Sequence, residues 1–161
     1  MKEIELTQGK VALVDDEDFE YLNRYKWCAH WNGRHLYAVR TDYSEQKQRA
    51  ILMHRVILER HGYDLTGLNV DHQNHNGLDN RLINLRPATK SQNSQNRKKS
   101  LGLSKYKGVS WYSRDHKWEA YIGIDSHLIH LGHFDDEQSA AEAYNQAAIG
   151  LFGEFACLNN I

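Results

Sequence analysis

The segment from Val70 to Arg86, VDHQNHNGLDNRLINLR, restricts the fold of this 161-residue chain more than any other stretch. Histidine, asparagine and aspartate recur throughout it, so no continuous apolar face of a helix or a strand runs through the segment. Asn, Asp and Gly are typical of turns, because the short polar side chains bond to nearby backbone and glycine adopts unusual dihedral angles. The segment is therefore either a polar loop rich in turn-forming residues or a scaffold that holds ligands around a cation.

Size and composition limit the class of protein. A chain of 161 residues, 40% hydrophobic and 25% charged, can form one ordinary globular domain or two small ones. No apolar run approaches the roughly 20 residues of a membrane-spanning helix. The acidic N-terminus has no apolar signal core, which predicts a cytoplasmic protein without a membrane partner. Cys28 and Cys157 lack any CxxC pattern and are predicted to be free thiols.

The net charge of −1 hides an uneven distribution. Residues 1–20 carry seven acidic residues against two lysines, whereas residues 90–117 carry eight Lys or Arg against the single Asp115. Aromatic residues interrupt the end of the basic segment in KYKGVSWYSRDHKW. This combination is typical of contacts with nucleic-acid phosphates and bases, although a solvated linker is the plainer alternative for the basic charges.

The first hundred residues predict a mixed region of short strands and helices. Strands are expected at 10–15 and 35–41, because both runs are apolar or alternate. Helices are expected at 16–27, with Phe19, Leu22 and Tyr25 on one face, and at 50–62, with Gly62 after the last turn. Pro87 favours a turn into a short polar helix. A linker is expected at 97–105, where basic residues occur with Gly and Ser.

The residues from 105 onward predict a second small unit. Three strand-like runs, 107–113, 117–124 and 127–134, are separated by short turns, and a helix capped by Asp135 follows them. Alternation brings Trp118, Ala120 and Ile122 to one strand face, with Ile129 and Leu131 on the next strand, to pack on the helix. The expected apolar face of the helix consists of Ala140, Ala141, Tyr144, Ala147, Ala148 and Leu151. The predicted fold class is α+β.

Asp71 and His72 suggest hydrolytic chemistry in the polar segment. A divalent cation that assists phosphodiester hydrolysis prefers oxygen ligands, which Asp and Asn supply. Histidine suits a general base because its ordinary pKa lies near neutrality. Adjacent residues of a strand point to opposite faces, so this pair is expected at a bend or a strand end. Asn93 lies on the predicted polar helix and is a candidate to turn its amide oxygen towards Asp71.

The pattern of DH at 71–72, Asn84 within INL, Asn93 within SQN and MHR upstream resembles the HNH endonucleases of the His-Asn-Asn subtype found in homing enzymes. The resemblance implies a ββα-metal nuclease core at about 50–100, which residues 1–49 extend with additional strands to give a nuclease domain at 1–100. It also implies that His72 is the general base and that Asp71 and Asn93 are metal ligands. Asn84 would brace the loop through hydrogen bonds to backbone.

The ligand set favours one divalent ion, most simply Mg²⁺ with Mn²⁺ as the alternative. A carboxamide at position 93, where many relatives carry histidine, is a weak ligand for Zn²⁺ and a fair one for Mg²⁺. His72 would deprotonate the attacking water, and the ion would stabilise the charge that develops on the phosphate. The resemblance implies 5′-phosphate and 3′-hydroxyl ends. For His54 the residues favour packing or a phosphate contact, and for Asp79 and Asn80 a turn with local hydrogen bonds.

The tail resembles the APETALA2-type DNA-binding domain, through YKGV, KW, HLGHF, AAEAY and LN, over nearly all of residues 105–160, and this resemblance predicts a DNA-binding domain at 101–161. The resemblance implies that the sheet lies in the DNA major groove while the helix supports it. Arginines that plant members carry on the sheet are replaced here, so plant target preference does not transfer, and affinity should depend on phosphate contacts and fall with salt. The predicted DNA-binding residues are Lys105, Lys107, Ser110, Tyr112, Arg114, Lys117, Tyr121 and His130.

Taken together, the sequence predicts a metal-dependent homing-type endonuclease that acts on double-stranded DNA, of phage or bacterial origin, and that is a monomer or a weak dimer. A single metal centre favours nicking by each monomer. The alternative from another class is a catalytically inactive DNA-binding regulator built on the same scaffold. A zinc-binding structural protein is a weaker alternative, because the histidines are scattered and the polar segment holds no cysteine.

Overall fold

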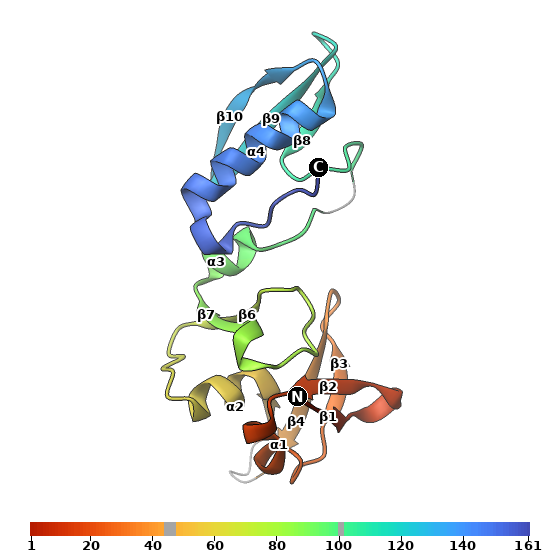
Figure 1. Ribbon diagram of the computed structural model, residues 1–161, viewed down its shortest axis with the longest axis vertical. Coiled ribbons are helices and arrows are strands. Elements are labelled where there is room, and N and C mark those ends of the chain that lie inside the picture. The colour runs from red at the N-terminus through yellow and green to blue at the C-terminus, as the bar shows by residue number, and fades with distance from the viewer. Residues whose placement is uncertain (44–47, 100–101) are drawn as a thin grey trace. The chain divides into compact units, whose positions relative to one another are not determined.

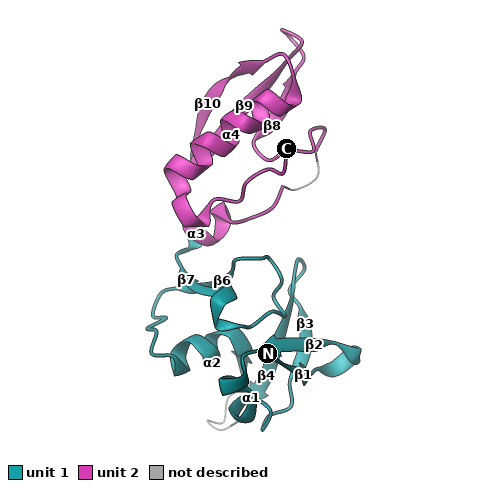
Figure 2. Ribbon diagram, viewed as in Figure 1, with its two compact units in different colours: residues 1–90 teal, residues 91–161 magenta. Residues whose placement is uncertain are grey.

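The chain forms two compact units, Met1–Lys90 and Ser91–Ile161, in the computed structural model (Figure 2). The structure describes residues 1–43, 48–99 and 102–161. Ser100 and Leu101, which belong to the linker expected at 97–105, lie outside the described residues. Helices and antiparallel strands are mixed in the chain, which confirms the predicted α+β class (Figure 1).

The first unit is built from small antiparallel sheets and two α-helices around one apolar core. Strands β1 and β2 form a hairpin, β3, β4 and β5 form a three-stranded sheet, and β6 pairs with β7. The core includes Ile4, Leu22, Trp27 and Met53, all nearly inaccessible to solvent. The elements are β1 (Lys2–Glu5), η1 (Thr7–Gly9), β2 (Val11–Val14), α1 (Asp16–Leu22), β3 (Cys28–Trp31), β4 (Leu36–Asp42), β5 (Arg49–Leu52), α2 (Met53–Arg60), β6 (Asn69–His72), η2 (Leu82–Asn84) and β7 (Leu85–Ala88).

The predicted helix at 50–62 was partly wrong. Residues Arg49–Leu52 form β5, and only Met53–Arg60 are helical. Thr41 and Val39 of β4 pair with Ala50 and Leu52 in antiparallel register, so backbone pairing with a distant segment overrides the local helical pattern.

Two other local predictions also gave way to tertiary contacts. Helix α1 ends at Leu22 rather than continuing to Trp27, because the Trp27 indole is buried and donates a hydrogen bond to the carbonyl of Leu22 (2.9 Å). Pro87 lies within β7 opposite Val70 rather than in a turn. A proline is tolerated in an edge strand because its missing N–H need not face a partner.

The second unit is a three-stranded antiparallel sheet, in the order β10-β9-β8, with helix α4 across one face (Figure 1). Ala120 and Ile122 of the central strand are buried against Ala140, Ala141, Tyr144 and Ala148 of the helix. The alternation predicted for the central strand is therefore confirmed. The elements that complete the chain are α3 (Lys90–Gln95), β8 (Val109–Tyr112), β9 (Lys117–Ile124), β10 (His127–Phe134), α4 (Glu137–Phe152) and η3 (Gly153–Phe155).

Three details of this unit differ from the sequence predictions. The helix cap is Asp136, whose carboxylate accepts from the Ser139 backbone N–H (2.8 Å), whereas Asp135 pairs with Lys117. Phe152, not Leu151, is the last apolar residue packed on the sheet. Ile129 is 40% exposed although it pairs with the buried Ile122, because β10 is an edge strand of the sheet.

Gly108, just before β8, fixes the contact between sheet and helix. Its φ of +72° is strained for other residues, and a β-carbon would approach the Tyr121 carbonyl to 2.5 Å and overlap the buried Tyr144 ring. We expect Gly108→Ala to destabilise the second unit by roughly 2 to 4 kcal/mol, from overpacking added to left-handed strain. Amide hydrogen exchange of peptides from residues 102–161 measures the loss.

Gly67→Ala is the matched control. Gly67, in the first unit, has the same φ (+72°), but nothing lies within 4 Å of the position that a β-carbon would take, so only the backbone strain of about 1 to 2 kcal/mol applies, measured on peptides that contain residue 67. Equal losses for the two variants would show that the Tyr144 contact contributes nothing.

Candidate active site

Asp71 and His72 are the last two residues of β6, a strand that pairs with β7 at the two ends of the polar segment. This is the strand end that the sequence predicted. Both residues are buried, at 4% and 6% exposure. Arg86, the cross-strand partner of Asp71, donates from Nε (2.8 Å) and Nη2 (2.7 Å) to Asp71 Oδ2. The ion pair compensates the buried carboxylate and fixes its orientation.

The His72 ring is held among polar and aromatic side chains. Its Nε2 lies 3.4 Å from Asn80 Oδ1, and its centroid lies 5.1 Å from that of His54 and 5.7 Å from that of Tyr37. Burial lowers the pKa of His72 to about 4, against smaller opposing effects from Asn80 and Asp71. At neutral pH the imidazole is therefore uncharged, which is the form that accepts a proton.

Asn80 is a site residue that the sequence analysis missed. The predicted turn with local hydrogen bonds is present, since Asp79 binds Arg81 (2.7 Å) and its N–H donates to the Asn76 carbonyl (3.0 Å), but both Asp79 and Asn80 are also buried. The Asn80 N–H donates to the carbonyl of Leu13 in β2 (2.8 Å), and its Nδ2 donates to the Leu78 carbonyl (3.3 Å). With Nδ2 so engaged, Oδ1 faces His72. The pairing of this loop with β2 has no signal in the local sequence.

Asn84 connects the two ends of the loop. Its Oδ1 accepts from the Asn74 backbone N–H (2.9 Å), and its Nδ2 donates to the Asp79 carbonyl (2.7 Å). The backbone carbonyl of Asn84 also accepts from the Gln73 N–H (2.9 Å). Asn84 therefore makes the backbone hydrogen bonds expected of a bracing residue. Because Gln73 directly follows His72, these bonds restrict the position of the imidazole.

His54, on α2, packs against the same ring. The sequence suggested either packing or a phosphate contact for His54, and the burial of the side chain favours packing. Its ring meets those of His72 and Tyr37 edge to face, and burial lowers its pKa well below the ordinary value. Within the described residues, its Nδ1 is among the buried polar atoms that have no hydrogen-bond partner.

Asn93, the other predicted metal ligand, lies on α3 and is half-buried. It belongs to the second unit, whereas Asp71 belongs to the first, and their joint role as ligands stays a prediction. The chemistry of the pair fits a hard divalent ion, because both side chains offer oxygen donors.

Comparison with known proteins identifies the first unit and extends over both. Residues 52–95 match the family model described as HNH endonuclease, a range that includes Asp71, His72, Asn84 and Asn93. An HNH endonuclease of Acanthamoeba polyphaga mimivirus is 32% identical over 154 residues, which cover 96% of this chain and 77% of the relative. The chain belongs to the HNH endonuclease family. This chain is therefore an endonuclease. Enzymes of this family generally use a divalent metal ion.

Plant proteins match a shorter part of this HNH endonuclease. An APETALA2-like protein 2 of Oryza sativa is 41% identical over 56 residues, which are 35% of this chain and 13% of the plant protein. An ethylene-responsive transcription factor of Arabidopsis thaliana is 39% identical over 62 residues, or 37% of this chain and 14% of that factor. The similarity covers a short part of each plant protein.

Five of the predicted DNA-binding residues share the sheet face opposite α4: Ser110, Tyr112, Lys117, Tyr121 and His130. Cross-strand register pairs Ser110 with Glu119, and Tyr121 with His130, on the side that alternates with the buried residues. Tyr112 shares this face and stacks on His133, with ring centroids 4.9 Å apart. Whether these residues bind DNA stays a prediction.

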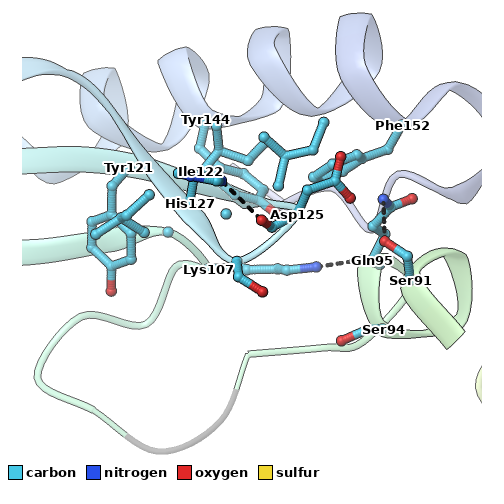
Figure 3. A pocket seen from close by; sticks show the side chains of 15 residues that line it. Ser91, Ser94, Gln95, Lys107, Tyr121, Ile122, Asp125, His127, Tyr144 and Phe152 are labelled. Carbon is cyan, nitrogen blue, oxygen red and sulfur yellow. Dashed lines mark hydrogen bonds between the residues drawn. The ribbon is translucent and has the colours of Figure 1, made fainter.

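The four predicted basic contacts have different surroundings. Arg114 is exposed, and Lys117 binds Asp135 (2.6 Å). Lys105 is exposed, with its ammonium over the Tyr106 ring. Lys107 instead donates to the Gln95 carbonyl (2.6 Å) at a cavity of about 660 Å³, and burial lowers its pKa (Figure 3). Its charge is thus directed at the end of α3.

Two further findings concern membrane-spanning helices and the two cysteines. Among the described residues, none of the helices has the length and apolarity needed to cross a bilayer. Cys28 and Cys157 are free thiols, as the sequence predicted.

Proposed function

We propose that this HNH endonuclease hydrolyses phosphodiester bonds of double-stranded DNA with Mg²⁺ as its ion, and that its second unit, an APETALA2-like module, holds it on the duplex. The observation that carries the proposal is that Asp71 and an uncharged, buried His72 lie next to each other at the end of β6. The homing type is part of the proposal, since it follows from the resemblance of the Asp71, His72, Asn84 and Asn93 pattern.

The contacts of His72 suggest which nitrogen takes the proton. If Nε2–H donates to Asn80 Oδ1, the unprotonated nitrogen is Nδ1. This nitrogen accepts a proton from the attacking water while the water oxygen bonds to phosphorus and the bond from phosphorus to the 3′ oxygen breaks. The 3′ oxygen takes up a proton from solvent, and the products carry a 5′-phosphate and a 3′-hydroxyl.

Asp71 and Asn93 would hold the metal ion, whose contribution when bound is to stabilise negative charge on the phosphate and the leaving oxygen. Asn84 keeps the loop, and with it His72, in position. Arg86 holds the Asp71 carboxylate in place through its contacts with Oδ2. The roles of these residues are the parts of the proposal that mutagenesis can test.

A supercoiled-plasmid assay tests the proposal. We expect nicked circles in Mg²⁺ or Mn²⁺ and intact supercoils in EDTA, because the proposed mechanism needs the ion to stabilise negative charge on the phosphate. Ligation of the nicked product by DNA ligase without prior end treatment reports the 5′-phosphate and 3′-hydroxyl ends. DNA binding without nicking in any of these ions would instead support the inactive regulator.

A further inference from the structure

Three potential metal ligands, Glu119, His130 and His133, converge on the face of the β8–β9–β10 sheet that lies opposite α4. Their candidate ligand atoms all lie within 4.8 Å of one another. His130 and His133 are exposed and Glu119 is half-buried, so an ion in solution can reach all three.

A β-bulge in β10 brings the two histidines to the same face. Residues three apart in a regular strand point to opposite faces. Here the register shifts between His130 and Gly132, so that His130 pairs with Tyr121 while His133 pairs with Glu119. Leu131, the additional residue, packs into the core beneath α4. Gly132 has a φ of +134°, which permits the bulge. The local backbone is thus arranged so that two imidazoles stand next to one carboxylate.

Neighbouring side chains orient the three groups. The ring of His133 stacks on Tyr112 at 4.9 Å, and the rings of His130 and His133 are 4.7 Å apart. The hydroxyl of Ser110 donates to Glu119 Oε1 at 2.7 Å. Hydrogen bonds of this kind to a ligating carboxylate are usual around metal sites in proteins, because they fix the direction of the ligand.

A second acidic and histidine cluster among the described residues, Glu17, Asp18 and His61, serves as a comparison. There, Arg60 donates to Asp18 Oδ1 (3.2 Å) and His61 contacts Asp18 Oδ2 (3.0 Å), so both carboxylate oxygens are already engaged. On the sheet, Lys117, a lysine of the same face, is bound to Asp135 instead. The Glu119 cluster is therefore the better candidate for an ion.

We propose that Glu119, His130 and His133 bind one transition-metal ion of the Zn²⁺ class. Two imidazole nitrogens and a carboxylate are a common three-residue ligand set for Zn²⁺, with the fourth position left to water or another oxygen ligand. Imidazole also selects Zn²⁺ over Mg²⁺, which prefers oxygen donors. This site therefore differs in ion preference from the oxygen-donor pair Asp71 and Asn93.

The position of the site has a consequence that rests on the proposed function of the second unit. Without an ion, Glu119 places a negative charge on the face predicted to meet DNA. A bound divalent ion reverses that charge and leaves a coordination position for a phosphate oxygen. DNA affinity should therefore rise when Zn²⁺ binds, because phosphate neutralisation releases counterions.

Metal binding is tested on the full chain, stripped with EDTA and then kept in excess Mg²⁺ to saturate oxygen-donor sites. Equilibrium dialysis against Zn²⁺, with elemental analysis, should give one more bound ion for the wild-type chain than for Glu119→Gln/His130→Asn/His133→Asn. Co²⁺ should give a visible absorption spectrum that the triple variant lacks. His127→Asn, an exposed histidine on the same strand, is the matched control and should behave as wild type.

Circular dichroism checks that the triple variant is folded. If it is not, the single variants His130→Asn and His133→Asn replace it in the assay, and each should weaken Zn²⁺ binding. Equal Zn²⁺ binding by wild type and by these variants would overturn the metal site. In a second arm, Zn²⁺ should tighten binding of a short duplex by the wild type roughly fivefold, but not by the triple variant. If Zn²⁺ binds but duplex affinity does not change, the metal site is supported and its proposed effect on DNA binding is contradicted. A failure to bind duplex with or without Zn²⁺ would count against the proposed function instead.

Discussion

Replacing His72 with alanine should reduce plasmid nicking by roughly 10²- to 10⁴-fold, which is the usual contribution of a general base. The side chain lies beside Asp71 at the end of β6, in its uncharged form, with Nε2 next to Asn80. No neighbouring group of the same chemistry can replace it, since the only imidazole in ring contact among the described residues is the buried His54. Duplex affinity, measured by fluorescence anisotropy, should change little, because the predicted DNA-binding residues are all in the second unit.

Two further variants make this experiment decisive. His72→Gln fills most of the volume of the imidazole, so a loss of nicking in both variants cannot be attributed to a cavity. His75→Asn changes a neighbouring loop histidine whose φ of +65° asparagine tolerates, and it should nick at the wild-type rate. Equal loss of nicking and of duplex binding in His72→Ala would contradict the assigned role of His72.

The sequence could predict features that depend on local pattern. The alternation of Trp118, Ala120 and Ile122 identified the face of β9 that packs on α4, and the position of Asp71–His72 at a strand end followed from the strand geometry. These predictions succeeded because the period of a strand is two residues, whatever the strand pairs with.

The features that were missed depend on partners far apart in the chain. Ala50 and Leu52 match a helical pattern and become strand only because β4 supplies a pairing edge. Asn80 is typical of a turn, but its contact with Leu13 buries it and directs its amide oxygen at His72. The clustering of Glu119 with His133 depends on a bulge whose register no local pattern specifies. Functional geometry in this chain therefore comes mainly from tertiary pairing.

Arg86 is the clearest case of a residue whose importance depends on such pairing, and its loss should have the largest effect on stability. Its guanidinium makes two contacts, of 2.8 and 2.7 Å, with one oxygen of the buried Asp71, and the two side chains are only 11% and 5% exposed. Arg86→Met keeps the apolar stem but leaves the carboxylate without this cation. Because an uncompensated buried charge is unfavourable, we expect a loss of about 3 to 5 kcal/mol. Hydrogen exchange of peptides from residues 69–88 in the full chain measures it.

The neighbouring pair of Arg81 and Asp79 is the matched control. Its contacts are as short, at 2.7 and 2.6 Å, and Asp79 is also buried. However, Asp79 keeps a hydrogen bond from Asn74 Nδ2 (2.8 Å), and the arginine side chain is 35% exposed, so water can replace the guanidinium when it is removed. Arg81→Met should therefore cost clearly less than Arg86→Met. Adding Asp71→Asn to Arg86→Met removes the isolated charge and should restore part of the lost stability, although nicking should remain abolished because the predicted metal ligand is changed. If Arg86→Met were no less stable than Arg81→Met, or if Asp71→Asn gave no recovery, the ion pair would not be what compensates the Asp71 carboxylate, and its orientation at the site would need another source.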